Sequence, residues 1–137
     1  MNQTLHAKPV PHPSPLSTPY WDGARQGKLM LQRCGSCAVF RHYPQWLCGR
    51  CQSADTQWVQ ASGRGKVYSW TTTHHAFHPG FIAELPYTLV TVDMAEGVRV
   101  LARFNSDTPL KLDLPVVLHF ESDAQGTPVP TFEPAAA

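Results

Sequence analysis

Two pairs of cysteines constrain the fold of this 137-residue chain more than any other feature of its sequence. They are Cys34-Gly35-Ser36-Cys37 and Cys48-Gly49-Arg50-Cys51, separated by ten residues, and the chain has no other cysteine. Two residues between the cysteines of a pair let both sulfurs of a tight turn point at one ion. A short hairpin between the pairs then closes a tetrahedral site. We predict one metal site formed by Cys34, Cys37, Cys48 and Cys51.

Zinc is the metal that we expect at this site. Two disulfides are disfavoured because nothing in the chain indicates secretion, and a redox dithiol is disfavoured because no βαβ pattern surrounds either pair. Iron accepts the same geometry of four sulfurs and stays open as the alternative metal. Protein sulfurs fill all four positions, so the site has no place for water or substrate. We therefore expect a structural zinc that stabilises a segment too short to build its own core.

Residues 1–16 predict a flexible, proline-rich arm. Its alternating prolines at positions 9, 11, 13 and 15 favour polyproline geometry over a helix. The first residues have neither the basic start nor the apolar run of a secretory signal. No stretch of the chain approaches the ~20 apolar residues that a membrane-spanning helix needs. We therefore expect a soluble, cytoplasmic protein that does not act at a membrane.

A short helix and a zinc ribbon are predicted next. Residues 17–27 indicate the helix, because Pro19 suits its first turn and Gly27 can end it. Residues 28–60 then predict a rubredoxin-like zinc ribbon that contains both cysteine pairs. We expect the aromatic residues between the pairs to cover the small core of the ribbon; they are Phe40, Tyr43 and Trp46.

Residues 61–133 predict an all-β unit. Alternating apolar residues and turn signals indicate five short strands, at 66–74, 87–94, 98–104, 116–121 and 127–132. Pro128 and Pro130 favour an edge position for the last strand, because proline cannot donate a ladder hydrogen bond. Five strands after a ribbon predict a small barrel of the oligonucleotide/oligosaccharide-binding (OB) type. The fold is thus mainly β: a helix, a zinc ribbon and a five-stranded barrel, with residues 134–137 as a tail.

A segment rich in histidine and phenylalanine follows the first barrel strand. It reads His74-His75-Ala76-Phe77-His78-Pro79-Gly80-Phe81, and in OB barrels the loop at this place commonly reaches a ligand. A second metal or a catalytic base is disfavoured, because no carboxylate lies at ligand spacing. We predict that this segment contacts a partner subunit or its substrate channel through His75, Phe77, His78 and Phe81. The alternative is that Phe77 and Phe81 close the open end of the barrel.

Several stretches of the chain, in order, resemble the zinc-ribbon plus OB-fold acyl-CoA-associated family, long described as a domain of unknown function. The resemblance covers about residues 18 to 133. Besides both cysteine pairs, the matching stretches are Tyr20-Trp21-Asp22-Gly23, Gly27-Lys28-Leu29, Tyr43-Pro44, Ala61-Ser62-Gly63-Arg64-Gly65-Lys66-Val67-Tyr68-Ser69-Trp70-Thr71, Pro86-Tyr87, Glu96-Gly97-Val98-Arg99 and Pro130-Thr131-Phe132.

The resemblance implies a helper subunit. Such proteins accompany thiolase-fold enzymes, either aldolases or acyltransferases, and the enzyme partner supplies the catalytic groups. The histidine-rich loop is similar to that of the steroid-aldolase branch. The implied function is a non-catalytic, zinc-stabilised partner subunit of a thiolase-like retro-aldolase that cleaves an acyl-CoA side chain of a steroid or similar compound. It further implies two copies of each chain, with acyl-CoA held mainly by the partner.

Two alternatives from other classes stay open. Zinc ribbons and OB barrels also occur in proteins that bind single-stranded nucleic acid, which requires a basic groove with exposed aromatic residues. The barrel half has few basic residues and several carboxylates, so we do not expect a nucleic-acid partner. The basic residues are Arg64, Lys66, Arg99, Arg103 and Lys111. The other alternative is a stand-alone acyl-CoA-binding protein. The chain offers no Ser-His-Asp set or reactive cysteine, so we do not expect catalysis by this chain alone.

Overall fold

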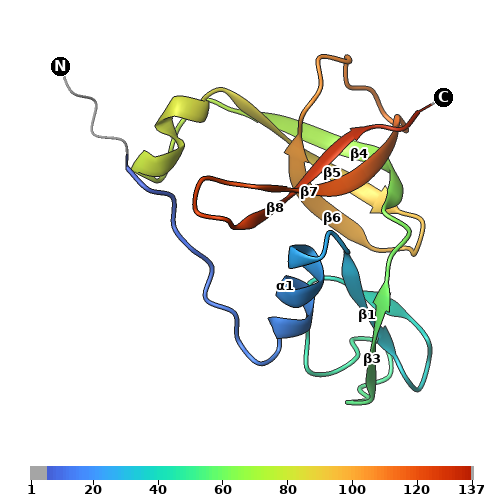
Figure 1. Cartoon of the computed structure of the whole chain (residues 1–137). Coiled ribbons are helices and arrows are strands. Elements are labelled where there is room, and N and C mark those ends of the chain that lie inside the picture. The colour runs from blue at the N-terminus through green and yellow to red at the C-terminus, as the bar shows by residue number, and fades with distance from the viewer. Residues whose placement is uncertain (1–5, 137) are drawn as a thin grey trace.

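The mainly-β fold expected from the sequence is confirmed by a computed structural model that describes residues 6–136 (Figure 1). The first five residues of the predicted arm and the last residue of the predicted tail lie outside this range. No helix within it is long and apolar enough to cross a membrane. The elements are α1 (Thr18–Arg25), β1 (Met30–Cys34), β2 (Phe40–Arg41), β3 (Thr56–Gln60), β4 (Arg64–Thr73), the 3-10 helix η1 (Pro79–Glu84), β5 (Tyr87–Met94), β6 (Arg99–Phe104), β7 (Pro115–Ser122) and β8 (Pro128–Pro134).

The zinc ribbon is a three-stranded antiparallel sheet in the order β2-β1-β3. A buried polar contact joins its strands. The side-chain oxygen of Gln32 accepts hydrogen bonds from Nε of Arg41 at 2.7 Å and from the backbone N–H of Gln45 at 2.8 Å. Arg41 also donates to the hydroxyl of Thr56 at 2.6 Å. These bonds hold the chain between the two cysteine pairs against the sheet, because buried polar groups are costly when they lack partners.

The five remaining strands form a closed barrel in the order β4-β5-β6-β8-β7. The expectation that β8 is an edge strand is wrong, because β8 lies between β6 and β7. Its prolines are tolerated because the pairing with β6 is restricted to Thr131 and Phe132. Pro128, Pro130 and Pro134 pair with β7 alone. The barrel therefore closes through two residues that are not prolines.

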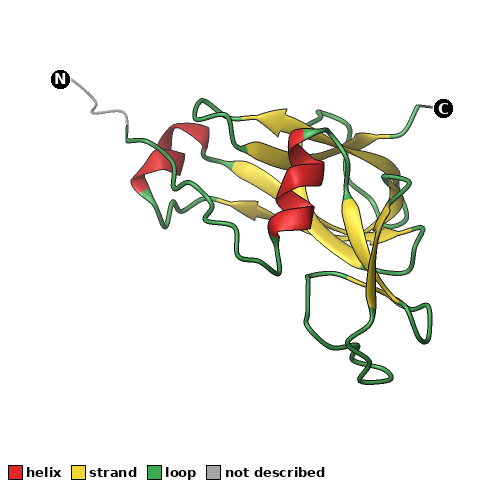
Figure 2. Ribbon diagram, turned by 60° about the horizontal axis from the view of Figure 1, so that its bottom comes forward, coloured by secondary structure: helices red, strands yellow, loops and turns green. Residues whose placement is uncertain are grey.

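The ribbon and the barrel share one core. Leu29 and Leu31, which begin the ribbon, are buried in the same cluster as Val90, Val92 and Phe132 of the barrel. Helix α1 contacts both β1 and β8 and lies across the junction (Figure 2). The ring of Tyr20 in α1 lies 6.4 Å from that of Phe120 in the barrel and 5.9 Å from that of His42 in the ribbon. Burial raises the pKa of Tyr20 to about 12, so it stays neutral at this junction.

The prediction that the aromatic residues between the cysteine pairs cover the ribbon core is only partly correct. Phe40 packs against the shared core, whereas Tyr43 is 56% and Trp46 is 67% exposed. The buried pair Gln32 and Arg41 lies beneath this segment, with the Arg41 guanidinium also bonded to Gln45 and Thr56. A hydrogen-bonded network thus fills the place where an aromatic core was expected.

The glycine at position 65 is expected to be irreplaceable in β4. A Cβ atom at Gly65 would lie 2.5 Å from Cγ1 of Val92 and 2.6 Å from the carbonyl oxygen of Asp93. The backbone of β5 cannot move without disturbing the barrel, so Gly65→Ala should lower the free energy of unfolding by about 1–3 kcal/mol. Urea unfolding measures this change. Gly49→Ala is the matched control, since a Cβ there would meet nothing within 4 Å, and equal stability of the two variants would refute the steric argument.

Candidate metal centre and partner-contact loop

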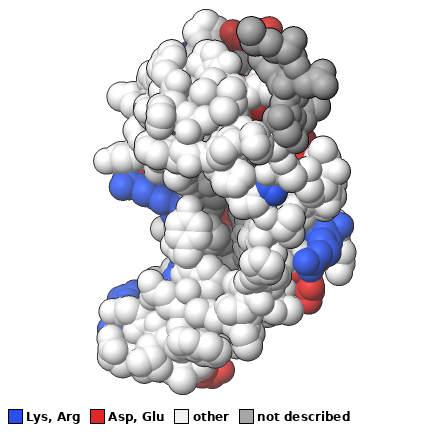
Figure 3. Space-filling model, turned by 90° about the vertical axis from the view of Figure 1, so that its left-hand side faces the viewer, with Lys and Arg blue, Asp and Glu red and all other residues white. Residues whose placement is uncertain are grey.

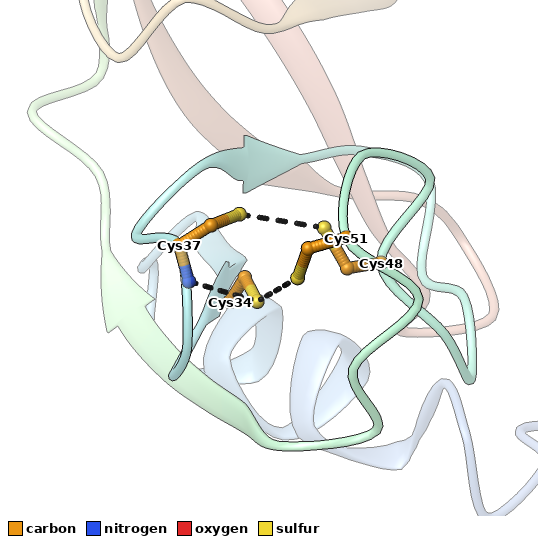
Figure 4. A group of neighbouring side chains, drawn as sticks. All are labelled: Cys34, Cys37, Cys48 and Cys51. Atoms are coloured by element: carbon orange, nitrogen blue, oxygen red, sulfur yellow. Dashed lines mark hydrogen bonds between the residues drawn. The ribbon is translucent and has the colours of Figure 1, made fainter.

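The four cysteines converge on one point, as their spacing predicts. Cys34 ends β1, and the other three lie in the two turns that face it (Figure 4). The four sulfur atoms all lie within 4.8 Å of one another. The sulfurs of Cys34 and Cys51 are 3.5 Å apart, and those of Cys37 and Cys48 are 3.6 Å apart. These separations are far longer than a disulfide bond of about 2.05 Å, and all four thiols are free.

The arrangement fits a tetrahedral zinc ion. Zinc–sulfur bonds of about 2.3 Å place the sulfurs of a tetrahedral site about 3.8 Å apart, close to the separations in this site. Backbone N–H groups of Ser36 and Cys37 each lie 3.4 Å from the sulfur of Cys34, and that of Arg50 lies 3.4 Å from the sulfur of Cys48. The N–H of Cys37, together with that of Ser36, lowers the pKa of the Cys34 thiol to about 6 against the opposing effect of burial. Although the backbone N–H of Ser53 opposes the shift, contact with the other three sulfurs and burial raise the pKa of the Cys51 thiol to about 11. The spacing of the four sulfurs therefore carries the assignment of a structural zinc.

No second metal cluster is present among residues 6–136, where the four cysteines form the only such group of histidine, cysteine and carboxylate side chains. Two of the three histidines of the loop after β4 make other contacts. His75 stacks edge-on against Phe77, with ring centroids 4.9 Å apart. The Nδ1 atom of His78 accepts a hydrogen bond from the N–H of Gly80 at 3.0 Å and so caps η1.

The four residues predicted to contact a partner divide into two pairs. His75 and Phe77 point outward, and Phe77 is 91% exposed. His78 and Phe81 are partly buried, and the ring of Phe81 lies 6.2 Å from that of His78 and 6.4 Å from that of Tyr87. Phe77 therefore does not close the end of the barrel. In the alternative explanation of this loop, only Phe81 is left for that role.

A charged cluster beside the loop was not predicted from the sequence. Glu84 of η1 accepts from Lys8 of the arm at 2.9 Å, and its other oxygen lies 3.5 Å from Arg103 of β6. The guanidinium of Arg103 stacks on the ring of Tyr87 at 3.7 Å. These residues line a cleft of about 680 Å³ between the arm, η1 and the barrel. Residues 8, 84 and 103 are too far apart in the chain for a sequence pattern to reveal their contact.

Comparison with known proteins agrees with this architecture. Residues 21–57 match the family described as "ChsH2, rubredoxin-like zinc ribbon domain", and residues 58–121 match "ChsH2, C-terminal OB-fold domain". A solved structure titled "Ltp2-ChsH2(DUF35) aldolase" contains a chain that is 35% identical, with a TM-score of 0.81 over 93% of this chain and 100% of that one. The chain belongs to the ChsH2/DUF35 family. The family resemblance and the zinc ribbon inferred from the sequence are thereby confirmed.

Two curated relatives of the chain carry enzyme-subunit names. One, "Probable enoyl-CoA hydratase alpha subunit" of Thermomonospora curvata, is 39% identical over 119 residues, which are 85% of this chain and 36% of that protein. Another, "3-oxo-4,17-pregnadiene-20-carboxyl-CoA hydratase alpha subunit" of Mycobacterium tuberculosis, is 30% identical over 93 residues, which are 68% of this chain and 29% of that protein. The chain thus spans about a third of the length of these relatives.

Proposed function

We propose that this chain is the non-catalytic, zinc-stabilised partner subunit of a thiolase-fold acyl-CoA enzyme. The observation that carries the proposal is the match of the whole ribbon and barrel to the DUF35 chain of a structure titled an aldolase. The most specific form of the proposal is a retro-aldolase that shortens an acyl-CoA side chain of a steroid or similar compound. A relative named for a pregnadiene carboxyl-CoA supports the steroid class. In the complex, two copies of each chain assemble, and the partner holds most of the acyl-CoA.

Contacts among the side chains agree with a helper role. Among residues 6–136, the four cysteines form the metal centre. His119 contacts the carboxylates of Glu121 and Glu133 and not a serine. A nucleophile needs a base in hydrogen-bond contact or a lowered pKa in an open site. We therefore assign the nucleophile and the base to the partner.

Turnover is expected only from the complex. The tagged chain, produced in its native host, should copurify with a thiolase-fold enzyme that mass spectrometry identifies. The homogeneous chain alone should not convert acyl-CoA substrates, whereas the copurified complex should. Catalysis by the isolated chain would overturn the assignment. Tight binding of single-stranded DNA with a steep salt dependence would instead favour the nucleic-acid alternative, and acyl-CoA binding without any partner would favour a stand-alone binding protein.

The loop after β4 is the part of this chain that we place against the partner or its substrate channel. Figure 3 shows the side of the molecule on which η1 lies, and few charged side chains show on its upper lobe. Phe77 is 91% and Ile82 is 61% exposed, so apolar side chains project into solvent there. Exposed apolar groups that gather on one surface often mark an interface. His75 supports the Phe77 ring, while His78 and Phe81 hold the base of the loop.

Phe77→Ala is expected to weaken the complex without destabilising the chain. Truncation of a buried aromatic anchor typically costs more than about 1 kcal/mol of binding free energy. Titration calorimetry with the copurified enzyme measures the affinity, and thermal unfolding of the isolated chain measures its stability. Leu101→Ala is the matched control, because Leu101 is 48% exposed on β6. Wild-type affinity of Phe77→Ala would refute a contact role, and His78→Ala is tested separately because it also removes the cap of η1.

A further inference from the structure

One edge of strand β4 is unpaired over half of its length. β4 pairs with β7 only at residues 64–66, and the backbone of Val67 bonds with the loop at Asp113 and Leu114. From residue 68 to residue 73, its pairing within the described chain is with β5 alone. The register shifts between Val67 and Ser69, which marks a bulge, and bulges bend a strand away from its sheet. β4 therefore parts from β7 and runs on toward η1 as the edge strand of the β4-β5-β6 part of the sheet (Figure 1).

Both faces of this segment are in solvent. A strand in a barrel wall alternates between buried and exposed residues, but residues 68–72 are all exposed, including Tyr68 at 47% and Trp70 at 43%. The segment reads Tyr-Ser-Trp-Thr-Thr-Thr, which is rich in residues that favour strands. Residues 69–73, which lie beyond the bulge, contain neither the charges nor the prolines that normally keep an exposed edge from pairing with another chain. Such an edge is a template for an added strand.

The charges beside the edge indicate what kind of strand fits it. Arg64 and Lys66 are exposed two residues apart at the start of β4, so they lie on one face, and neither forms an ion pair with a carboxylate of residues 6–136. A second copy of this chain, paired along the same edge, does not bring a carboxylate to Arg64 or Lys66. Antiparallel self-pairing over residues 68–73 brings Lys66 toward residues 74–77, which contain no carboxylate, and parallel self-pairing in register brings Lys66 beside Lys66.

We propose that the free edge of β4, residues 68–73, receives an extended strand of the partner enzyme by β-sheet addition. The added strand carries apolar or β-branched side chains beside Tyr68 and Trp70 and a carboxylate at the end that lies near Lys66. Main-chain hydrogen bonds supply the affinity in this mode of recognition, and the side chains supply the specificity. The inference rests on the proposed function, from which it takes the partner, and adds the surface through which that partner attaches.

Amide hydrogen exchange of the free chain and of the copurified complex tests the proposal without any substitution. The outward-facing amides of residues 68–73 should exchange rapidly in the free chain and at least about tenfold more slowly in the complex, because pairing closes them. An intact complex without added protection there overturns this inference and leaves the proposed function standing. Failure of any thiolase-fold enzyme to copurify counts against the proposed function and this inference together. The free chain could instead become protected at residues 68–73 as its concentration rises and sediment as a dimer. That result overturns this inference and indicates that a second copy of the chain pairs with β4.

Two adjacent proline substitutions provide an independent test. In an antiparallel ladder, alternate residues point their N–H toward the same neighbour. Of the two adjacent residues Thr71 and Thr72, one therefore points its N–H toward β5 and the other points its N–H toward the free edge. Proline at the outward position should keep the wild-type unfolding temperature and weaken the complex at least about 100-fold, because it removes a donor and blocks approach. Proline at the inward position should destabilise the chain. An outward variant that folds and binds normally overturns the inference.

Discussion

Replacing Cys37 with serine is expected to release the metal and unfold the ribbon. Structural zinc sites contribute apparent binding free energies of about 10–16 kcal/mol at neutral pH, whereas whole domains are stable by only about 5–15 kcal/mol. Loss of one of four ligands therefore removes the main source of stability of the ribbon. Elemental analysis should give about one zinc per chain for the wild type and much less for Cys37→Ser. Near-UV circular dichroism reports the tryptophan environments of the ribbon.

The loss of stability in Cys37→Ser is expected to extend from the ribbon to the barrel. Leu29 and Leu31 belong to the same buried cluster as the barrel strands, so unfolding of the ribbon exposes one side of the barrel core. The barrel should then melt at a lower temperature, and a strong chelator should produce the same shift in the wild type. Ser36→Ala is the matched control, because Ser36 contributes its backbone N–H to Cys34 and only an exposed hydroxyl contact to Ser53. Intact disulfides by mass spectrometry, or well under one metal per chain in fresh wild-type protein, would contradict the zinc assignment.

The elements that could be predicted from the sequence are those with a regular pattern or a strict spacing. The predicted strand at residues 87–94 coincides with β5, where Val90, Val92 and Met94 are buried. Its alternation is clean because both neighbours of β5 pair with it over most of its length. The cysteine site was predictable for a different reason: four sulfurs at ribbon spacing have few ways to satisfy one ion. Both features can therefore be seen within a short stretch of the sequence.

The errors arose where tertiary contacts decide the outcome. Proline in a strand predicts an edge, yet β8 is enclosed because its pairing with β6 needs only Thr131 and Phe132. Tyr43 and Trp46 were expected in a core that the bonds of Gln32 and Arg41 occupy instead. A rule based on neighbouring residues cannot reveal which residues of β8 pair with the distant strand β6. Nor can it reveal that the buried side chain of Arg41 donates to Gln32 and to the backbone carbonyl of Gln45.

The surface features were the least accessible to sequence reasoning. The strand pattern of β4 is continuous, and only the pairing of its neighbours shows that β7 leaves it after residue 66. Likewise, the ion pair of Lys8 with Glu84 spans 76 positions of the chain. The histidine- and phenylalanine-rich loop was recognised from composition, but its division into an exposed tip and a packed base depends on how η1 lies against Tyr87.

Phe132→Ala is expected to cost the barrel about 3–5 kcal/mol of unfolding free energy, the range for truncation of a fully buried phenylalanine. Phe132 is 0% exposed, and it pairs with Phe104 of β6 and Leu118 of β7 at the point where β8 closes the barrel. The substitution removes a ring that no neighbour can replace and leaves a cavity in the shared core. Urea unfolding followed by tryptophan fluorescence measures the loss.

The same substitution at Phe77 provides the sharpest control. Phe77 is 91% exposed, so Phe77→Ala should change the unfolding free energy by less than about 0.5 kcal/mol, as surface substitutions usually do. The two variants thus separate stability from association: one phenylalanine holds the barrel closed, and the other is placed to contact the partner. If Phe132→Ala were as stable as Phe77→Ala, β8 would not close the barrel core. If Phe77→Ala were the less stable of the two, the loop would be part of the core, and its assignment as a contact surface would be wrong.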